Sequence, residues 1–178
     1  MVNISMISLR ALLCGSLAAI ALAVATESRA QTYQGRQLVD AKLIADTTTI
    51  VPGREFNAGL LLKMQPGWHT YWQFPGDAGI PTEIKWNLPP GWEAGPIQWP
   101  IPLKLKEPGD IQIYGYHDEV LLMVALTPPK IAESAVKLAA GVEWLVCEKI
   151  CVPGHGDVQL ELPVGSESAP ANTDLFAK

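Results

Sequence analysis

The chain has 178 residues and a formal net charge of −5 at pH 7. This acidic balance argues against nucleic acid and anionic membrane surfaces as partners. Its 15 glycines and 15 prolines leave little uninterrupted chain for long helices, while a hydrophobic content of 48% supplies material for a core. These limits favour a single domain built from short strands.

Residues 1–30 have the pattern of a secretory signal peptide. An arginine precedes the uncharged apolar run 11–25, and small residues lead to a cleavage site near Ala30. The run is shorter than the roughly 20 apolar residues that a membrane-spanning helix needs. We therefore expect export to the periplasm and loss of Cys14 with the leader. Cys147 and Cys151 then remain in an oxidising compartment, where a disulfide is the usual state.

Alternating hydrophobic residues and turn signals predict about eight strands in a domain that covers residues 31–164. The expected strands are residues 37–46, 54–64, 68–72, 82–86, 111–116, 119–126, 135–146 and 157–162. The proline-rich stretch 87–110 is expected to be the least regular part. This pattern predicts an all-β fold, an antiparallel β-sandwich with the six tryptophans packed in its core. Residues 165–178 have the composition of a flexible C-terminal tail.

The sequence WLVCEKICVPG places Cys147 and Cys151 between the last two predicted strands, at the rim of a sheet. We expect the residues 152–154, Val-Pro-Gly, to turn the chain and keep the pair exposed. In the chain-entropy model, a disulfide closing about five residues stabilises a fold by roughly 2 kcal/mol, against nearly 5 kcal/mol for a loop near 100 residues. The spacing therefore favours a labile redox pair, with a purely structural disulfide as the alternative.

A metal site is the other alternative for the same residues. Cys147, Cys151 and His155 recur every four residues, and His69 and His117 are further candidate ligands for copper or zinc. A helix would align the first three, but the proline and glycine before His155 disrupt one. The weaker alternative function is thus a periplasmic copper- or zinc-binding module.

Residues 144–154, together with 66–92 and 114–126, resemble the amino-terminal periplasmic domain of the DsbD family, especially its ScsB-like branch. The resemblance covers residues 37–163. It implies an immunoglobulin-like sandwich that acts as a protein-disulfide reductase, with a redox-active disulfide and no other cofactor. It also implies that Cys151 forms the mixed disulfide with partners and that Cys147 resolves it. The implied partners are a membrane thiol relay protein, which supplies electrons, and periplasmic thioredoxin-like proteins, which receive them.

The sequence departs from this family pattern in three ways. Only three residues separate the cysteines, fewer than in the best-known members. The stretch 102–110, where those members carry a cap loop with acidic and aromatic residues, offers Leu103, Lys104, Leu105 and Lys106, so we assign no cap roles there. The membrane relay and the thioredoxin-like domain are not part of this chain, and we expect its reductant to be a separate protein.

Overall fold

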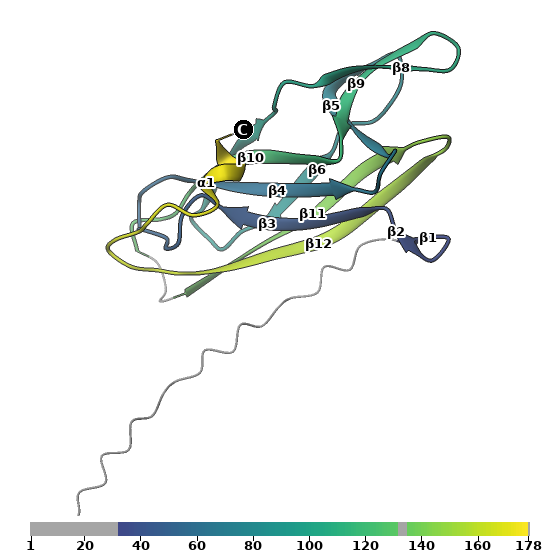
Figure 1. The fold of residues 1–178 in the computed structure, drawn as a ribbon. Coiled ribbons are helices and arrows are strands. Elements are labelled where there is room, and N and C mark those ends of the chain that lie inside the picture. The colour runs from purple at the N-terminus through teal and green to yellow at the C-terminus, as the bar shows by residue number, and fades with distance from the viewer. Residues whose placement is uncertain (1–31, 132–134, 178) are drawn as a thin grey trace, which may run out of the picture.

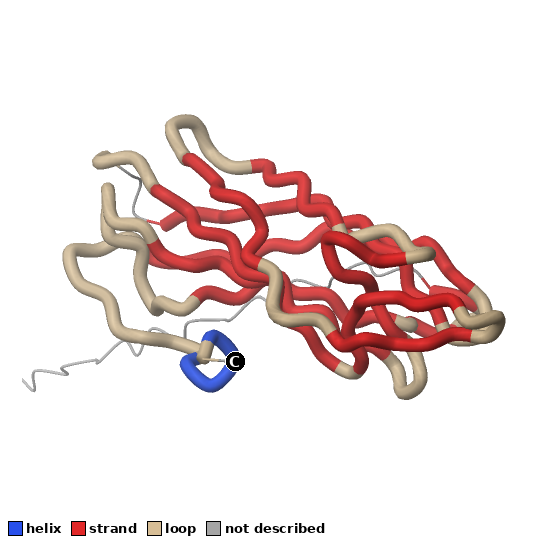
Figure 2. The backbone as a smooth tube through the Cα atoms, turned by 90° about the horizontal axis from the view of Figure 1, so that it is seen from above, coloured by secondary structure: helices blue, strands red, loops and turns tan. Residues whose placement is uncertain are grey.

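The structure is a computed structural model that describes residues 32–131 and 135–177 (Figure 1). The predicted signal peptide, residues 1–30, lies outside the described residues. Within them the chain forms twelve strands and one short helix, and strands dominate the backbone in the view from above (Figure 2). In the described part of the chain, no helix is long and apolar enough to cross a membrane.

One layer of the fold is a four-stranded antiparallel sheet. Its strands, in spatial order, are β3 (Val39–Ala45), β4 (Phe56–Met64), β10 (Glu119–Thr127) and β7 (Glu93–Gln98). Strand β4 alternates as predicted, with Phe56, Ala58 and Leu60 all buried. Such an alternation places one apolar face on the core, because successive side chains point to opposite faces of a strand.

The second layer is a six-stranded sheet that carries the cysteines. Its strands, in spatial order, are β12 (Cys151–Pro163), β11 (Ala135–Cys147), β5 (His69–Gly76), β9 (Ile111–His117) and β8 (Leu103–Glu107), and β6 (Glu83–Asn87) pairs with β11. A separate two-stranded ribbon is formed by β1 (Thr32–Tyr33) and β2 (Arg36–Gln37). The two longest strands, β11 and β12, form one hairpin that crosses the lower part of Figure 1.

The core lies between the two sheets, which confirms the predicted all-β sandwich. Every second residue of β11, from Val136 to Val146, is buried against the other layer. All six tryptophans belong to the core or pack against it, as predicted: Trp68, Trp72, Trp86, Trp92, Trp99 and Trp144. Each large apolar side chain that is fully buried in this way stabilises the fold by about 1.5–3 kcal/mol relative to exposure.

Three predicted irregular regions are strands in the structure. Residues 87–110 contain β7 and β8, and β5 continues to Gly76. The turn predicted at residues 152–154 is wrong, because β12 already begins at Cys151. Strands β7, β8 and β12 are all edge strands of their sheets. Proline is tolerated at an edge, where its missing N–H costs no ladder hydrogen bond.

The C-terminal segment, which we predicted to be a flexible tail, contacts the sandwich in the structure. Backbone hydrogen bonds of 2.9 Å and 2.8 Å join Thr48 N to Ala169 O and Ala171 N to Asp46 O. The short helix α1 (Thr173–Phe176) then lies on the outer face of the four-stranded sheet. There Leu175 and Phe176 pack against the buried residues Ile44, Leu61 and Leu121.

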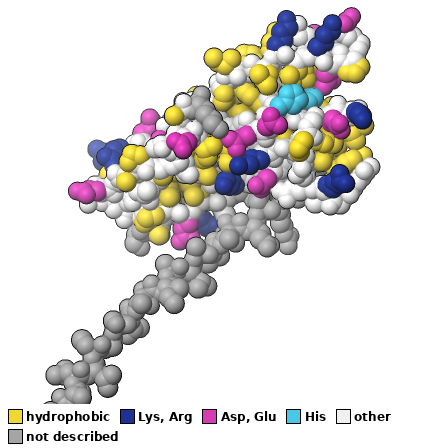
Figure 3. All heavy atoms as spheres, viewed as in Figure 1, with side chains coloured by type: hydrophobic (Ala, Val, Ile, Leu, Met, Phe, Trp, Pro, Cys, Tyr) yellow, Lys and Arg dark blue, Asp and Glu magenta, His cyan; other side chains and the backbone are white. Residues whose placement is uncertain are grey.

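Charged side chains of both signs are interspersed over the face that Figure 3 shows, and hydrophobic side chains are prominent on its upper, projecting part. Figure 1 places strands β8 and β9 in that projection. The projection matters for the site, because the residues that cover the cysteines come from it.

Candidate functional site: a half-buried disulfide

The disulfide lies at the closed end of the β11–β12 hairpin. These strands are paired from Ala135↔Pro163 to Cys147↔Cys151, so the two cysteines face each other directly with their Cα atoms 4.1 Å apart. The three residues 148–150 close the hairpin, where Glu148 N donates to Ile150 O at 3.1 Å. The prediction placed both cysteines on the connection between two long strands; in the structure they are the end residues of those two strands.

The two sulfur-bearing residues differ sharply in exposure. Cys147 is only 1% exposed, because β11 is an interior strand with neighbours on both sides. Cys151 is exposed, because it begins the edge strand β12. The expectation that the pair as a whole would be exposed is therefore correct for Cys151 and wrong for Cys147. An approaching thiolate has access to Cys151.

Tyr71 contacts both sulfurs from the neighbouring strand. Its Oη donates a hydrogen bond to Cys147 Sγ at 2.9 Å and lies 3.9 Å from Cys151 Sγ. Strand β5 pairs with β11 where His69 is the register partner of Cys147, and Tyr71 shares the same face of β5 two residues further on. Gly79 lies so close to the ring of Tyr71 that a Cβ at this position would collide with it. The backbone near Gly79 thus fixes the ring beneath the disulfide.

The environment of Tyr71 keeps its hydroxyl protonated. Burial raises its pKa to about 12, and the nearby carboxylate of Glu107 also contributes to the rise. A side chain with this pKa is a hydrogen-bond donor throughout the physiological range. Tyr71 is therefore suited to donate to a sulfur atom that gains negative charge.

His69 connects Tyr71 to an acidic side chain. Its Nε2 lies 3.3 Å from Tyr71 Oη and 3.2 Å from Glu107 Oε1. Burial lowers the pKa of His69, the charge of Glu107 opposes this effect, and the neighbouring His117 lowers the pKa further. The rings of His69 and His117 are 5.5 Å apart between centroids. His69 therefore links Tyr71, which contacts the sulfurs, to Glu107 of β8 and His117 of β9.

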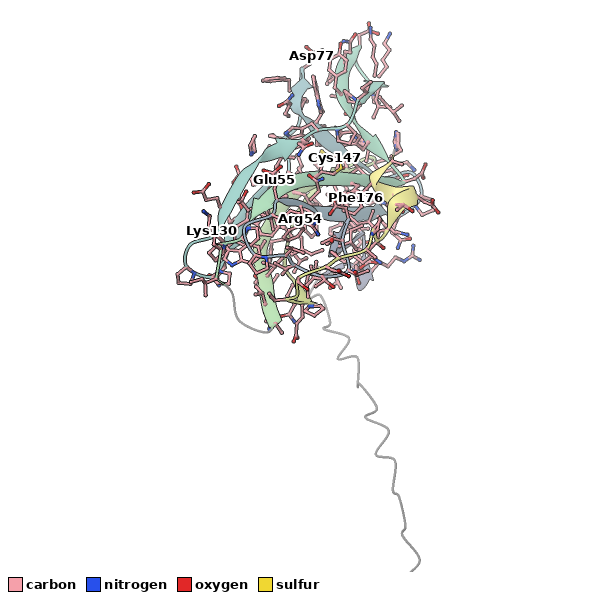
Figure 4. All side chains as sticks on the ribbon, turned by 90° about the vertical axis from the view of Figure 1, so that its left-hand side faces the viewer. Arg54, Glu55, Asp77, Lys130, Cys147 and Phe176 are labelled. Carbon is pink, nitrogen blue, oxygen red and sulfur yellow. A yellow bond between two sulfur atoms is a disulfide. The ribbon has the colours of Figure 1, made fainter. Side chains whose placement is uncertain are left out.

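The projecting strands cover the buried half of the disulfide. Leu105 of β8 and Ile111 of β9 pack against a cluster that contains Tyr71 and Cys147. The loop after β5 is tied to this hairpin by Asp77, whose Oδ2 accepts a hydrogen bond of 2.8 Å from the backbone N of Gln112. Figure 4 shows Asp77 in the upper projection, above Cys147.

The sequence stretch 102–110, to which we assigned no role, contributes to this cover. It forms β8, and Glu107 at its end reaches His69. We missed Glu107 as a site residue, named His69 only as a candidate metal ligand, and assigned no site role to Tyr71. The sequence signal that was available for the last two is their spacing, because residues 69 and 71 of a predicted strand must share one face.

The structure separates His155 from the other candidate metal ligands. His155 lies opposite Glu143 on the hairpin, four residues along β12 from Cys151, which is about 13 Å on a strand. The recurrence of Cys147, Cys151 and His155 every four residues therefore does not bring the three together. Among the described residues, no group of three or more His, Cys, Asp or Glu side chains is placed to hold a metal ion.

Comparisons with known proteins agree with this architecture. The family model for the N-terminal region of thiol:disulfide interchange protein DsbD matches residues 36–163. The N-terminal periplasmic domain of ScsB from Proteus mirabilis has a similar structure, with a TM-score of 0.55 and 20% sequence identity over 84% of this chain. The match covers 55% of the ScsB domain, so the chain spans about half of its length. The reduced N-terminal domain of DsbD from Neisseria meningitidis aligns with a TM-score of 0.37 and 15% identity, over 73% of this chain and 90% of that domain. No curated protein sequence matches the chain.

Proposed function

We propose that this chain, which belongs to the family of the N-terminal domain of thiol:disulfide interchange protein DsbD, exchanges disulfides with other proteins through Cys147 and Cys151. In this proposal the leader directs the protein to the periplasm. Electrons reach the pair from a membrane thiol reductant. The pair then passes them to periplasmic thioredoxin-like proteins.

The exchange takes two steps, with Cys151 as the outer cysteine and Cys147 as the resolving one. In the reduced protein, the thiolate of Cys151 attacks a partner disulfide, forming a mixed disulfide and releasing the partner's other sulfur as a thiolate. The thiolate of Cys147 then attacks Cys151 Sγ, which re-forms the internal disulfide and releases the partner's second sulfur. Two electrons pass from the cysteine pair to the partner.

The observation that carries this proposal is the unequal exposure of the two cysteines in a disulfide that the fold holds from both sides. Exposed Cys151 is open to a partner's sulfur, and buried Cys147 is protected from competing reactions. The strands that present the pair are joined by backbone pairing along their whole length. The disulfide can therefore open without releasing the hairpin.

Trapping the mixed disulfide tests the proposal. A Cys147→Ser protein retains only Cys151 after residue 30. A mixed disulfide with a thioredoxin-like protein whose own second cysteine has been replaced therefore cannot be resolved. We expect this adduct to accumulate on a non-reducing gel. The matched control is Cys151→Ser, in which the remaining thiol is buried and should form little adduct. Failure of Cys147→Ser to form the adduct, or equal adduct formation by the control, would contradict the assigned roles.

A further inference from the structure

Three polar side chains form a continuous path from the buried sulfur to the covering hairpin. Tyr71 Oη donates to Cys147 Sγ, His69 Nε2 lies beside Tyr71 Oη, and Glu107 Oε1 lies beside the same Nε2 atom. Each of these three contacts spans 2.9–3.3 Å. Distances of this size allow hydrogen bonds along the whole path.

We propose that Tyr71 is a catalytic residue that delivers a proton to Cys147 Sγ and removes it again, that His69 supplies and takes back this proton through Tyr71, and that Glu107 is a positioning residue for the His69 ring. The inference rests on the proposed function, because it assigns the proton chemistry of the same disulfide. It concerns residues on β5 and β8, far from the cysteines in sequence.

The need for such a path follows from the burial of Cys147. When the disulfide opens at Cys151, the electron pair of the broken bond is left on Cys147 Sγ. A thiolate in apolar surroundings is costly, because burial disfavours the charged form of the group. The sulfur lies among Tyr71, Ile113 and Leu105, and Tyr71 Oη is the polar atom that already points at it.

The opening step balances as follows. An incoming thiolate forms a bond to Cys151 Sγ, the bond between the two sulfurs breaks, and Cys147 Sγ takes the electron pair. Tyr71 Oη gives its proton to this sulfur and receives one from Nε2 of protonated His69. The products are a mixed disulfide at Cys151, the neutral thiol of Cys147, neutral Tyr71 and neutral His69, with one proton consumed.

The closing step runs the same path in reverse. Neutral His69 takes a proton at Nε2 from Tyr71 Oη, which takes the proton of the Cys147 thiol. The resulting thiolate attacks Cys151 Sγ and displaces the bound partner. Glu107 faces Nε2 and stabilises the protonated ring in both directions, which agrees with its raising effect on the pKa of His69.

This scheme predicts opposite pH dependences for the two steps. The titratable groups that face His69 are Tyr71 on its own strand, Glu107 on β8, His117 on β9 and its register partner Cys147 on β11. Burial places the pKa of His69 below the ordinary value of 6.5. Opening should therefore accelerate as the pH falls below about 6.5, and closing should slow over the same range.

The test measures the rate at which glutathione reduces the oxidised full-length protein between about pH 5 and pH 9. Each rate is divided by the concentration of glutathione thiolate at that pH, because the thiolate is the attacking species. Tyr71→Phe keeps the aromatic ring packed against Gly79 and removes the hydroxyl that donates to Cys147 Sγ. We therefore expect a rate of reduction about 10- to 100-fold lower, which is the effect of losing one hydrogen bond to a charged group. His69→Gln keeps a donor toward Tyr71 but cannot titrate. It should retain most of the rate at pH 8 and lose the acceleration in acid.

The matched control is Tyr116→Phe. Tyr116 is a buried tyrosine of β9 whose hydroxyl donates to Pro100 O at 2.8 Å, away from the sulfurs, and its loss should leave the rate and its pH profile unchanged. If Tyr71→Phe reacts within about 2-fold of the wild type with the same pH profile, or if His69→Gln keeps the acid acceleration, the proton path is refuted while disulfide exchange stands. A wild-type disulfide that glutathione does not reduce would overturn the proposed function itself.

Discussion

Opening the disulfide between Cys147 and Cys151 should leave the fold intact. The bond closes a loop of about five residues, for which the chain-entropy model gives a stabilisation of about 2 kcal/mol. The hairpin around it keeps thirteen register pairs from Ala135 to Cys147, and β11 is also held by β5 and β6. We therefore expect the reduced protein to be less stable by about 2 kcal/mol, roughly a 30-fold change in the unfolding equilibrium.

Urea unfolding of the oxidised and reduced proteins, followed by tryptophan fluorescence, measures this difference. Both forms should unfold cooperatively, with the midpoint of the reduced form shifted to lower urea. A Cys147→Ala, Cys151→Ala double variant should behave like the reduced form, which controls for effects of the reductant. A loss of more than about 4 kcal/mol, or a reduced form without a cooperative transition, would mean that the disulfide is a structural staple and would refute this reasoning.

Three further predictions concern the sandwich that supports the site. Gly154→Ala should destabilise the protein by about 1–3 kcal/mol in the same urea assay, because its Cβ would collide with the indole of Trp144. The control is Gly141→Ala on the same hairpin, whose Cβ meets only ordinary contacts and which should cost less than about 1 kcal/mol. Deleting residues 173–178 should cost about 1–3 kcal/mol, because it uncovers apolar side chains on the outer face of the four-stranded sheet, and an unchanged urea midpoint would show that this segment is a loose tail. His69 has a lowered pKa in the folded state, so on acidification the unfolded chain is protonated at this residue before the folded protein is, and the stability falls as the pH drops below about 6.5. In His69→Gln the slope of stability against pH should be shallower by up to about 1.4 kcal/mol per pH unit. An identical slope in the variant and the wild type would contradict the burial argument.

Most of the interior of the fold was predictable from period-two patterns. The alternation from Val136 to Val146 correctly predicted β11 and its buried face. Three of the missed or shortened strands share one physical cause, since β7, β8 and β12 are edge strands that contain or adjoin prolines. Proline is a local signal for a break, but whether a strand lies at an edge is decided by pairing with residues far away in sequence.

The site was predictable only in its local part. Cys147 and Cys151 stand four positions apart, so their pairing is visible in the sequence. Tyr71 reaches Cys147 across 76 positions, through the register of β5 on β11 and the close approach of Gly79. Neither spacing nor composition specifies that register. Glu107 was missed for the same reason, because its role depends on how the β8–β9 hairpin packs over the sheet.

The reduction potential of the Cys147–Cys151 couple tests the central claim most directly. It is measured by equilibrating the protein with thiol–disulfide buffers of defined potential and alkylating the free thiols. A disulfide that exchanges with thioredoxin-like partners should have a potential above about −300 mV, within reach of cellular dithiols. A value far below about −300 mV would contradict the account, because such a bond resists reduction and serves the structure.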